Sequence, residues 1–159
     1  MAIMLNSAEA LENWGNWWDA ERDPRTSLNI KMQSWARNIK PRYPGEHRQI
    51  HPHNPDIALQ TDRIVAMIGS DGDSVGRMYR DILIVTYMLR HSVQVRERPE
   101  ALKRMGHSLT GRSLDRFVGQ ATGAFYTEWK YYTTLLAEAR EVEKAKRRIN
   151  ALSIRQARR

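Results

Sequence analysis

The stretch from Arg98 to Tyr126 constrains the fold most, because it contains the end of one helix and the start of another. Pro99 suits the first turn of a helix, where its missing N–H costs nothing. Gly106 follows the last apolar residue of that helix, at the place where a left-handed residue commonly ends one. The pattern predicts two helices joined by a tight turn at Gly106.

The second helix of this pair has two unlike faces. Its apolar residues recur at helical spacing and must pack inward; they are Leu114, Val118, Ala121 and Phe125. The opposite face is basic and polar, and the N-terminal part of such a helix enters the major groove of DNA in a helix-turn-helix. We therefore expect a helix-turn-helix over residues 98–127. The alternative is a basic helix pair that only presents a solvated face over a core.

Arginine can donate two hydrogen bonds to the edge of guanine, whereas lysine serves phosphate as a point charge. We therefore expect the bases to be read by Arg112, Ser113 and Arg116. Residues nearer the DNA backbone are expected to be Lys103, Arg104 and Thr110, and the candidate set is completed by Ser108 and Gln120.

Composition narrows the class of protein. A chain of 159 residues forms one or two small domains, and the absence of cysteine excludes disulfides and thiolate metal sites. The net charge of +8 favours a polyanionic partner, either nucleic acid or an acidic protein surface. No apolar stretch approaches the roughly twenty residues that cross a bilayer, and the N-terminus lacks the basic region of a signal peptide. We expect a cytoplasmic protein that does not contact membranes.

The N-terminal segment predicts a helix from Asn6 to about Arg22, because Asn6 followed by Glu9 resembles a capping box. An apolar stripe follows on this helix, made of Leu11, Trp14 and Trp18, with Trp17 beside it. These tryptophans either pack in the core or form a docking surface for a partner, for which Trp17 is the candidate. A second helix is predicted from Ser27 to Ile39.

The stretch from Pro41 to Pro55 contains four prolines and is predicted to be a connecting loop. It also contains His47, His51 and His53. A metal site is not expected, because the chain has no cysteine and a closed zinc site needs four ligands. These histidines are expected to take part in turns or to contact phosphate instead. We expect no cofactor.

Periodicity returns at Asp56 and predicts a helix that ends near Gly69. The turn from Ser70 to Ser74 is not a calcium loop, because apolar residues fall where oxygen ligands are required. The next helix is predicted to run to about His91, followed by a link from Ser92 to Glu97. The residues of this helix that are expected to face inward are Val75, Met78, Tyr79, Ile82, Val85 and Leu89.

The helix that carries Phe125 is predicted to continue into a basic C-terminal end. Residues 140–159 contain eight Lys or Arg against two Glu, with a sparse apolar stripe of Val142, Ile149 and Leu152. This end is either a solvated tail or an arm that contacts the backbone of DNA or RNA. The whole chain therefore predicts an all-α compact domain, divided into N-terminal helices (1–40), the loop (41–55), a helical core (56–135) and the basic end (136–159). The common catalytic motifs are absent, so we do not expect an enzyme.

Several blocks resemble the shorter, zinc-free class of phage Q antitermination proteins. They are DIALQTDRIVAMI, YRDILIVTYMLR and ALKRMGHSLTGRSLDRFVGQATGAF, together with the W-G-x-W motif at Trp14 to Trp17, and they cover roughly half of the chain. The class carries a helix-turn-helix similar to region four of bacterial sigma factors. In this sequence the turn between Gly106 and Leu114 is about one residue longer than the turn of that sigma-like pattern.

The resemblance implies a factor that binds DNA at a phage late promoter, joins paused host RNA polymerase with sigma attached, and suppresses termination. It implies contact with the exit path of the nascent RNA, and DNA reading by Arg112, Ser113 and Arg116. Two alternatives stay open. One is an activator or repressor with a helix-turn-helix, and the other is a sigma-like phage regulator.

Overall fold

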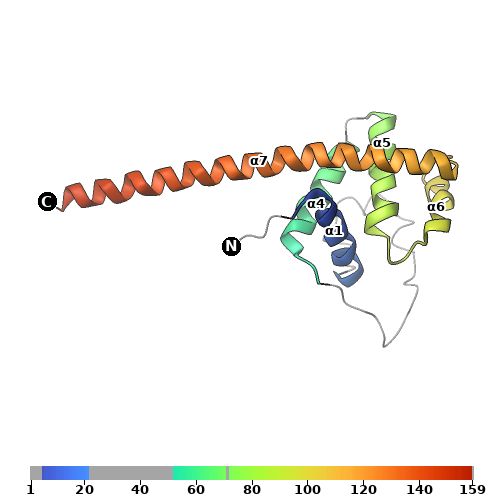
Figure 1. The fold of residues 1–159 in the computed structure, drawn as a ribbon, viewed down its shortest axis with the longest axis horizontal. Helices are drawn as coiled ribbons and strands as arrows, with labels where there is room; N and C mark the ends of the chain where they lie inside the picture. The colour runs from blue at the N-terminus through green and yellow to red at the C-terminus, as the bar shows by residue number, and fades with distance from the viewer. Residues whose placement is uncertain (1–4, 22–51, 71, 159) are drawn as a thin grey trace.

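The computed structural model describes residues 5–21, 52–70 and 72–158. These residues form helices and no strand, which confirms the all-α class (Figure 1). The main helices are α1 (Ser7–Glu21), α4 (Pro55–Ile68), α5 (Ser74–Leu83), α6 (Arg98–Arg104) and α7 (Gly111–Ala157). The predicted helix from Ser27 to Ile39 and the loop before residue 52 lie outside the described residues.

Helix α1 begins with the capping box that the sequence predicts. The Glu9 N–H donates to Asn6 Oδ1 at 2.9 Å, and the Asn6 N–H donates to the Glu9 carboxylate at 2.9 Å. The three tryptophans of α1 lie in the core, and Trp14 Nε1 donates to Asp62 Oδ1 of α4 at 3.0 Å. Trp17 is 2 % exposed. Of the two alternatives for these tryptophans, burial favours packing in the core over a docking surface at Trp17.

Helix α4 begins at Pro55, one residue earlier than predicted, because Pro55 occupies the first helical turn. The Asn54 side chain caps the helix by accepting from the N–H groups of Asp56 and Ile57. Asn13 of α1 in turn pairs with the Asn54 backbone, donating to its carbonyl at 2.9 Å and accepting from its N–H at 2.6 Å. These bonds fix the start of α4 against α1.

Helix α5 is shorter than predicted. It ends at Leu83 and widens into a π-helix, η1 (Ile84–Met88), in which the Leu89 N–H donates to the Ile84 carbonyl at 2.9 Å. The prediction of one regular helix up to about His91 is therefore wrong after Leu83. The inward placement of Val75 is also wrong: it is 44 % exposed, because the Asp73 cap places it in the first turn, beyond the core.

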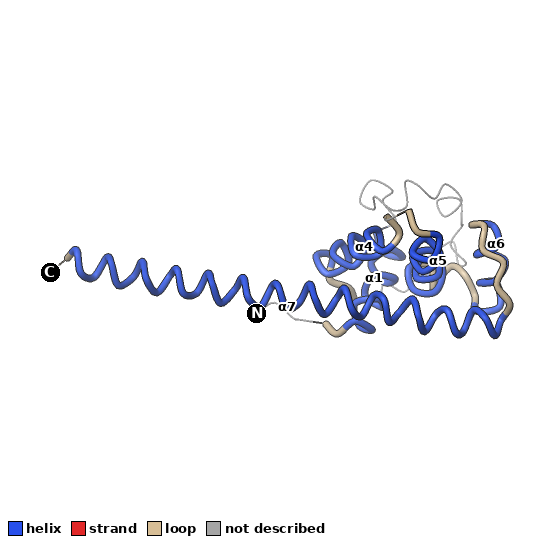
Figure 2. The backbone as a smooth tube through the Cα atoms, turned by 90° about the horizontal axis from the view of Figure 1, so that it is seen from above, coloured by secondary structure: helices blue, strands red, loops and turns tan. Residues whose placement is uncertain are grey.

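The link after η1 contains a short 3-10 helix, η2 (Val95–Glu97), and leads into α6. Helix α7 then runs for 47 residues, about 70 Å at 1.5 Å per residue. Its first half packs on the other helices, with Leu114, Ala121, Phe125 and Trp129 buried. Residues 137–157 are exposed and project away from the domain, which confirms the predicted helical C-terminal end (Figure 2). Within the described residues, no helix is both long and apolar enough to span a membrane.

Candidate nucleic-acid interface

The connection between α6 and α7 starts with a Schellman motif. Gly106 has a φ of +92°, its N–H donates to the Lys103 carbonyl at 3.0 Å, and the His107 N–H donates to the Leu102 carbonyl at 2.9 Å. A Cβ at Gly106 would meet no atom within 4 Å, so the backbone conformation and not the available space calls for glycine. The predicted turn at Gly106 is confirmed.

A buried carboxylate anchors this turn to the core. His107 Nε2 donates to Asp81 Oδ2 of α5 at 2.7 Å, and the two side chains are only 16 % and 5 % exposed. Asp81 Oδ1 accepts from Arg80 Nε at 3.0 Å. This pair was not predicted from the sequence, although Asp81 lies three positions after Met78 on the inward face of α5, which is a signal for a buried partner. Asp81 therefore fixes where α6 ends relative to α5.

The start of α7 uses two of the predicted DNA-contacting hydroxyls for its own cap. Thr110 Oγ1 accepts from the Ser113 N–H at 3.3 Å, and it donates to Ser113 Oγ at 3.0 Å. Thr110 is exposed and Ser113 is partly buried. Ser113 therefore offers less to a ligand than the arginines that flank it.

The basic candidates are exposed. Arg112 and Arg116 lie one turn apart on the side of α7 that faces away from the core, and the Arg116 guanidinium lies 5.0 Å from the ring centroid of Phe117. Lys103 and Arg104 are exposed in the last turn of α6, where Arg104 lies 4.0 Å from Glu100.

The remaining polar candidates differ in their contacts. Ser108 is exposed within the connection. Gln120 is also exposed, but its Oε1 accepts from the Tyr79 hydroxyl at 2.9 Å and so ties α7 to α5. The structure thus gives Gln120 a role in the fold that the sequence did not suggest.

Two glycines continue the exposed side of α7 beyond the arginines. Gly119 and Gly123 follow Arg116 at steps of three and four residues, and a Cβ built on either would meet no atom of the described residues within 4 Å. Glycine weakens a helix by about 1 kcal/mol relative to alanine, and the packing of the described residues does not require it here. We name Arg112, Arg116, Gly119 and Gly123 the arginine–glycine face.

Burial shifts the pKa values of two neighbouring side chains, Arg98 of α6 and Tyr87 of η1. Burial lowers the pKa of Arg98, the first residue of α6, below its ordinary value, an effect that the neighbouring Tyr87 opposes. Burial raises the pKa of Tyr87 above 10.0, while Arg98 acts in the opposite direction. Tyr87 therefore stays neutral at pH 7.

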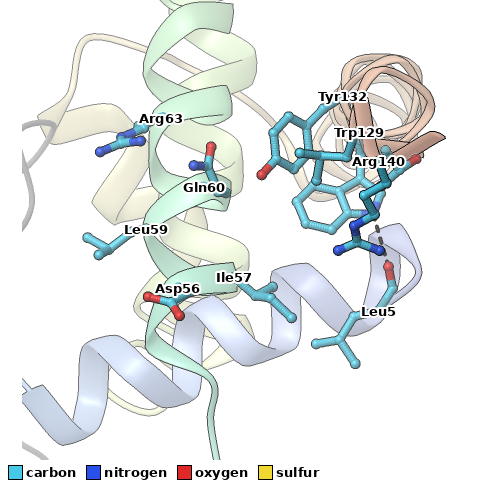
Figure 3. Close-up of a pocket in the computed structure, with 11 residues that line it drawn as sticks. Leu5, Asp56, Ile57, Leu59, Gln60, Arg63, Trp129, Tyr132 and Arg140 are labelled. Carbon is cyan, nitrogen blue, oxygen red and sulfur yellow. Dashed lines mark hydrogen bonds between the residues drawn. The ribbon is translucent and has the colours of Figure 1, made fainter. Parts of the chain in front are cut away.

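A groove of about 380 Å³ lies between α4 and α7 (Figure 3). Ile57 and Gln60 lie on the side of α4 that faces Trp129 and Tyr132 of α7. The end near α1 is closed by Leu5, whose carbonyl accepts from Trp129 Nε1 at 3.1 Å. The wall combines apolar and aromatic side chains with polar and charged ones, the latter being Asp56, Gln60, Arg63, Thr133 and Arg140.

The described residues contain no group of three histidine, aspartate or glutamate side chains that could hold a metal ion. His53 is partly buried near the start of α4, whereas His47 and His51 lie outside the described residues. Comparison with protein-family models, with curated proteins and with solved structures gives no match for this chain.

Proposed function

We propose that this chain is a phage transcription antitermination factor that binds DNA through α6 and the start of α7. The observation that carries the proposal is the arginine–glycine face, which is exposed directly after a turn anchored in the core by His107 and Asp81. The sequence resemblance to phage Q antitermination proteins supplies the step from DNA binding to the suppression of termination.

In this proposal each part of the interface has its own contact. Arg112 and Arg116 donate to base edges in the major groove, because arginine fits the acceptors of guanine. Lys103 and Arg104 neutralise phosphates, which makes the affinity fall steeply with salt. Gly119 and Gly123 let the helix backbone approach the DNA closely, since no side chain stands there.

The other proposed partners follow the resemblance. In the bacterial cytoplasm the DNA-bound protein joins host RNA polymerase that has paused with sigma attached, and it acts near the exit of the nascent RNA. The basic end of α7 supports a contact with a polyanion, since residues 140–159 carry eight Lys or Arg against two Glu.

Arg116→Ala tests base reading. We expect roughly a 10- to 100-fold loss of affinity for the specific site, which corresponds to about 1–3 kcal/mol for a lost bidentate contact, and little loss on random DNA. Arg63→Ala is the matched control, because it removes the same charge from an exposed position on α4, outside the proposed contacts. Fluorescence anisotropy on both DNAs measures the difference. An equal loss on both would make Arg116 a phosphate contact only.

Purified transcription tests the function itself. The template carries the phage DNA next to this gene, with a strong terminator beyond the promoter, and bacterial RNA polymerase is supplied with or without the protein. We expect read-through that requires both the protein and the native upstream DNA. Unchanged termination with altered initiation would instead identify a DNA-binding activator, repressor or sigma-like regulator.

A further inference from the structure

The outer half of α7 carries an apolar stripe that no other part of the described chain covers. Leu135, Val142 and Ile149 repeat every seven residues and are 45 %, 55 % and 62 % exposed. Leu152 follows Ile149 by three residues and is 59 % exposed, and Ala145 has the same place in the preceding repeat. This is the a and d pattern of a coiled coil.

The stripe points away from the domain. At 100° per residue it lies roughly 130° around α7 from the buried residues Phe125 and Trp129. A second helix could therefore pack along residues 135–152 without meeting α4 or α5. Ile154, which is 55 % exposed, lies on the opposite side of the helix and outside the stripe.

We infer that this stripe binds a second copy of the chain in a parallel, two-stranded coiled coil. Val142 and Ile149 at a positions, with Leu152 at d, are the residues that favour two strands. In register, Glu141 at position g faces Lys146 at position e of the second copy, and the two-fold axis repeats this attraction. The spacing of the apolar residues and the pairing of Glu141 with Lys146 thus both favour a second copy of the chain as the partner.

The attraction is moderate for two reasons. Glu138 occupies a d position and weakens the contact along the stripe, and the basic ends of two copies repel each other. Added salt screens this repulsion and also the two Glu141–Lys146 attractions. Because each end carries eight Lys or Arg against two Glu, the repulsion is the larger effect, and self-association should strengthen with salt. Binding of an acidic helix from another protein would weaken with salt, which separates the two kinds of partner.

The parallel arrangement places the N-termini of both α7 helices at the same end of the dimer. If the proposed function is correct, two arginine–glycine faces then read two half-sites related by a two-fold axis. The self-association itself does not depend on the proposed function, and it is measured without DNA.

Sedimentation equilibrium of the full chain tests whether two copies associate through the stripe. We expect reversible dimers of the wild type at ~0.1 mM, and Ile149→Asp should raise the Kd by roughly a hundredfold, since each dimer loses two buried isoleucines. Ile154→Asp is the matched control and should change the Kd by less than about threefold. Circular dichroism checks that both variants stay helical. A monomeric wild type, or equal effects of the two variants, overturns the inference.

Charge exchange and crosslinking test the register. Glu141→Lys and Lys146→Glu should each weaken the dimer, and the double variant should recover most of the loss. Because the chain has no cysteine, Leu152→Cys introduces the only thiol. Parallel strands in register bring the two thiols within disulfide range, so mild oxidation should give a covalent dimer. Failure of the double variant to recover, or of the thiols to crosslink, contradicts this arrangement.

Discussion

Replacing Trp14 with alanine should destabilise the fold by about 4 kcal/mol, as expected for truncation of a fully buried tryptophan. Trp14 is 0 % exposed, and it packs where α1 meets α4. The substitution also removes the indole N–H that donates to Asp62, whose side chain lies in the same core and is 4 % exposed. A buried carboxylate that loses a donor adds to the loss. Urea unfolding followed by circular dichroism measures the difference.

Two further variants separate the loss of apolar volume from the loss of the hydrogen-bond donor and give an exposed comparison. Trp14→Phe keeps most of the apolar volume but removes the donor to Asp62, so it should cost less than the alanine variant and more than an exposed substitution. Val95→Ala is the exposed comparison, because Val95 is 71 % exposed and its change should stay within about 0.5 kcal/mol. Equal stabilities of the Trp14→Ala variant and the wild type would show that α1 does not contribute to the core in solution.

Gly15→Ala should have the next largest effect, a loss of about 3 kcal/mol. A Cβ on Gly15 would overlap the carbonyl oxygen of Tyr87, a backbone atom of the π-helix that cannot turn aside as a side chain could. Such overpacking costs about 1–3 kcal/mol when the backbone must shift. This contact explains why glycine stands between the tryptophans of α1.

Gly119→Ala is the matched change in the opposite direction. Both positions are helical, but a Cβ on Gly119 meets no atom within 4 Å, so alanine should stabilise the helix by up to about 1 kcal/mol. Thermal unfolding of the two variants measures both shifts. Destabilisation by Gly119→Ala, or neutrality of Gly15→Ala, would contradict the packing described for α7 or α1.

The local signals in the sequence predicted the ends of helices well. Asn6 with Glu9, and Gly106, determine backbone hydrogen bonds within a few residues of themselves, so their effect can be read without the rest of the fold. The π-helix could not be predicted in this way. Its widened turn lies against α1 at Gly15, more than sixty residues away in sequence, and the periodicity of α5 gives no sign of that contact.

The candidate site also has features that the local sequence predicts and features that only the tertiary arrangement determines. Helical periodicity alone placed Arg112 and Arg116 together on an exposed face. The anchoring of the turn depends on Asp81 and His107, which come from different elements, and the pairing of Gln120 with Tyr79 depends on how α5 packs on α7. Such cross-element contacts are set by the tertiary arrangement.

Helix α7 is unbroken from the arginine–glycine face to its C-terminal end, and this has a mechanical consequence. Its first half is fixed to the domain by buried side chains from Leu114 to Trp129, so the exposed half turns only with the domain. The outermost residues lie roughly 45 Å beyond Trp129, so a rotation of the domain by about ten degrees would move the tip by roughly 8 Å. The orientation of the domain would thus set the position of the basic end.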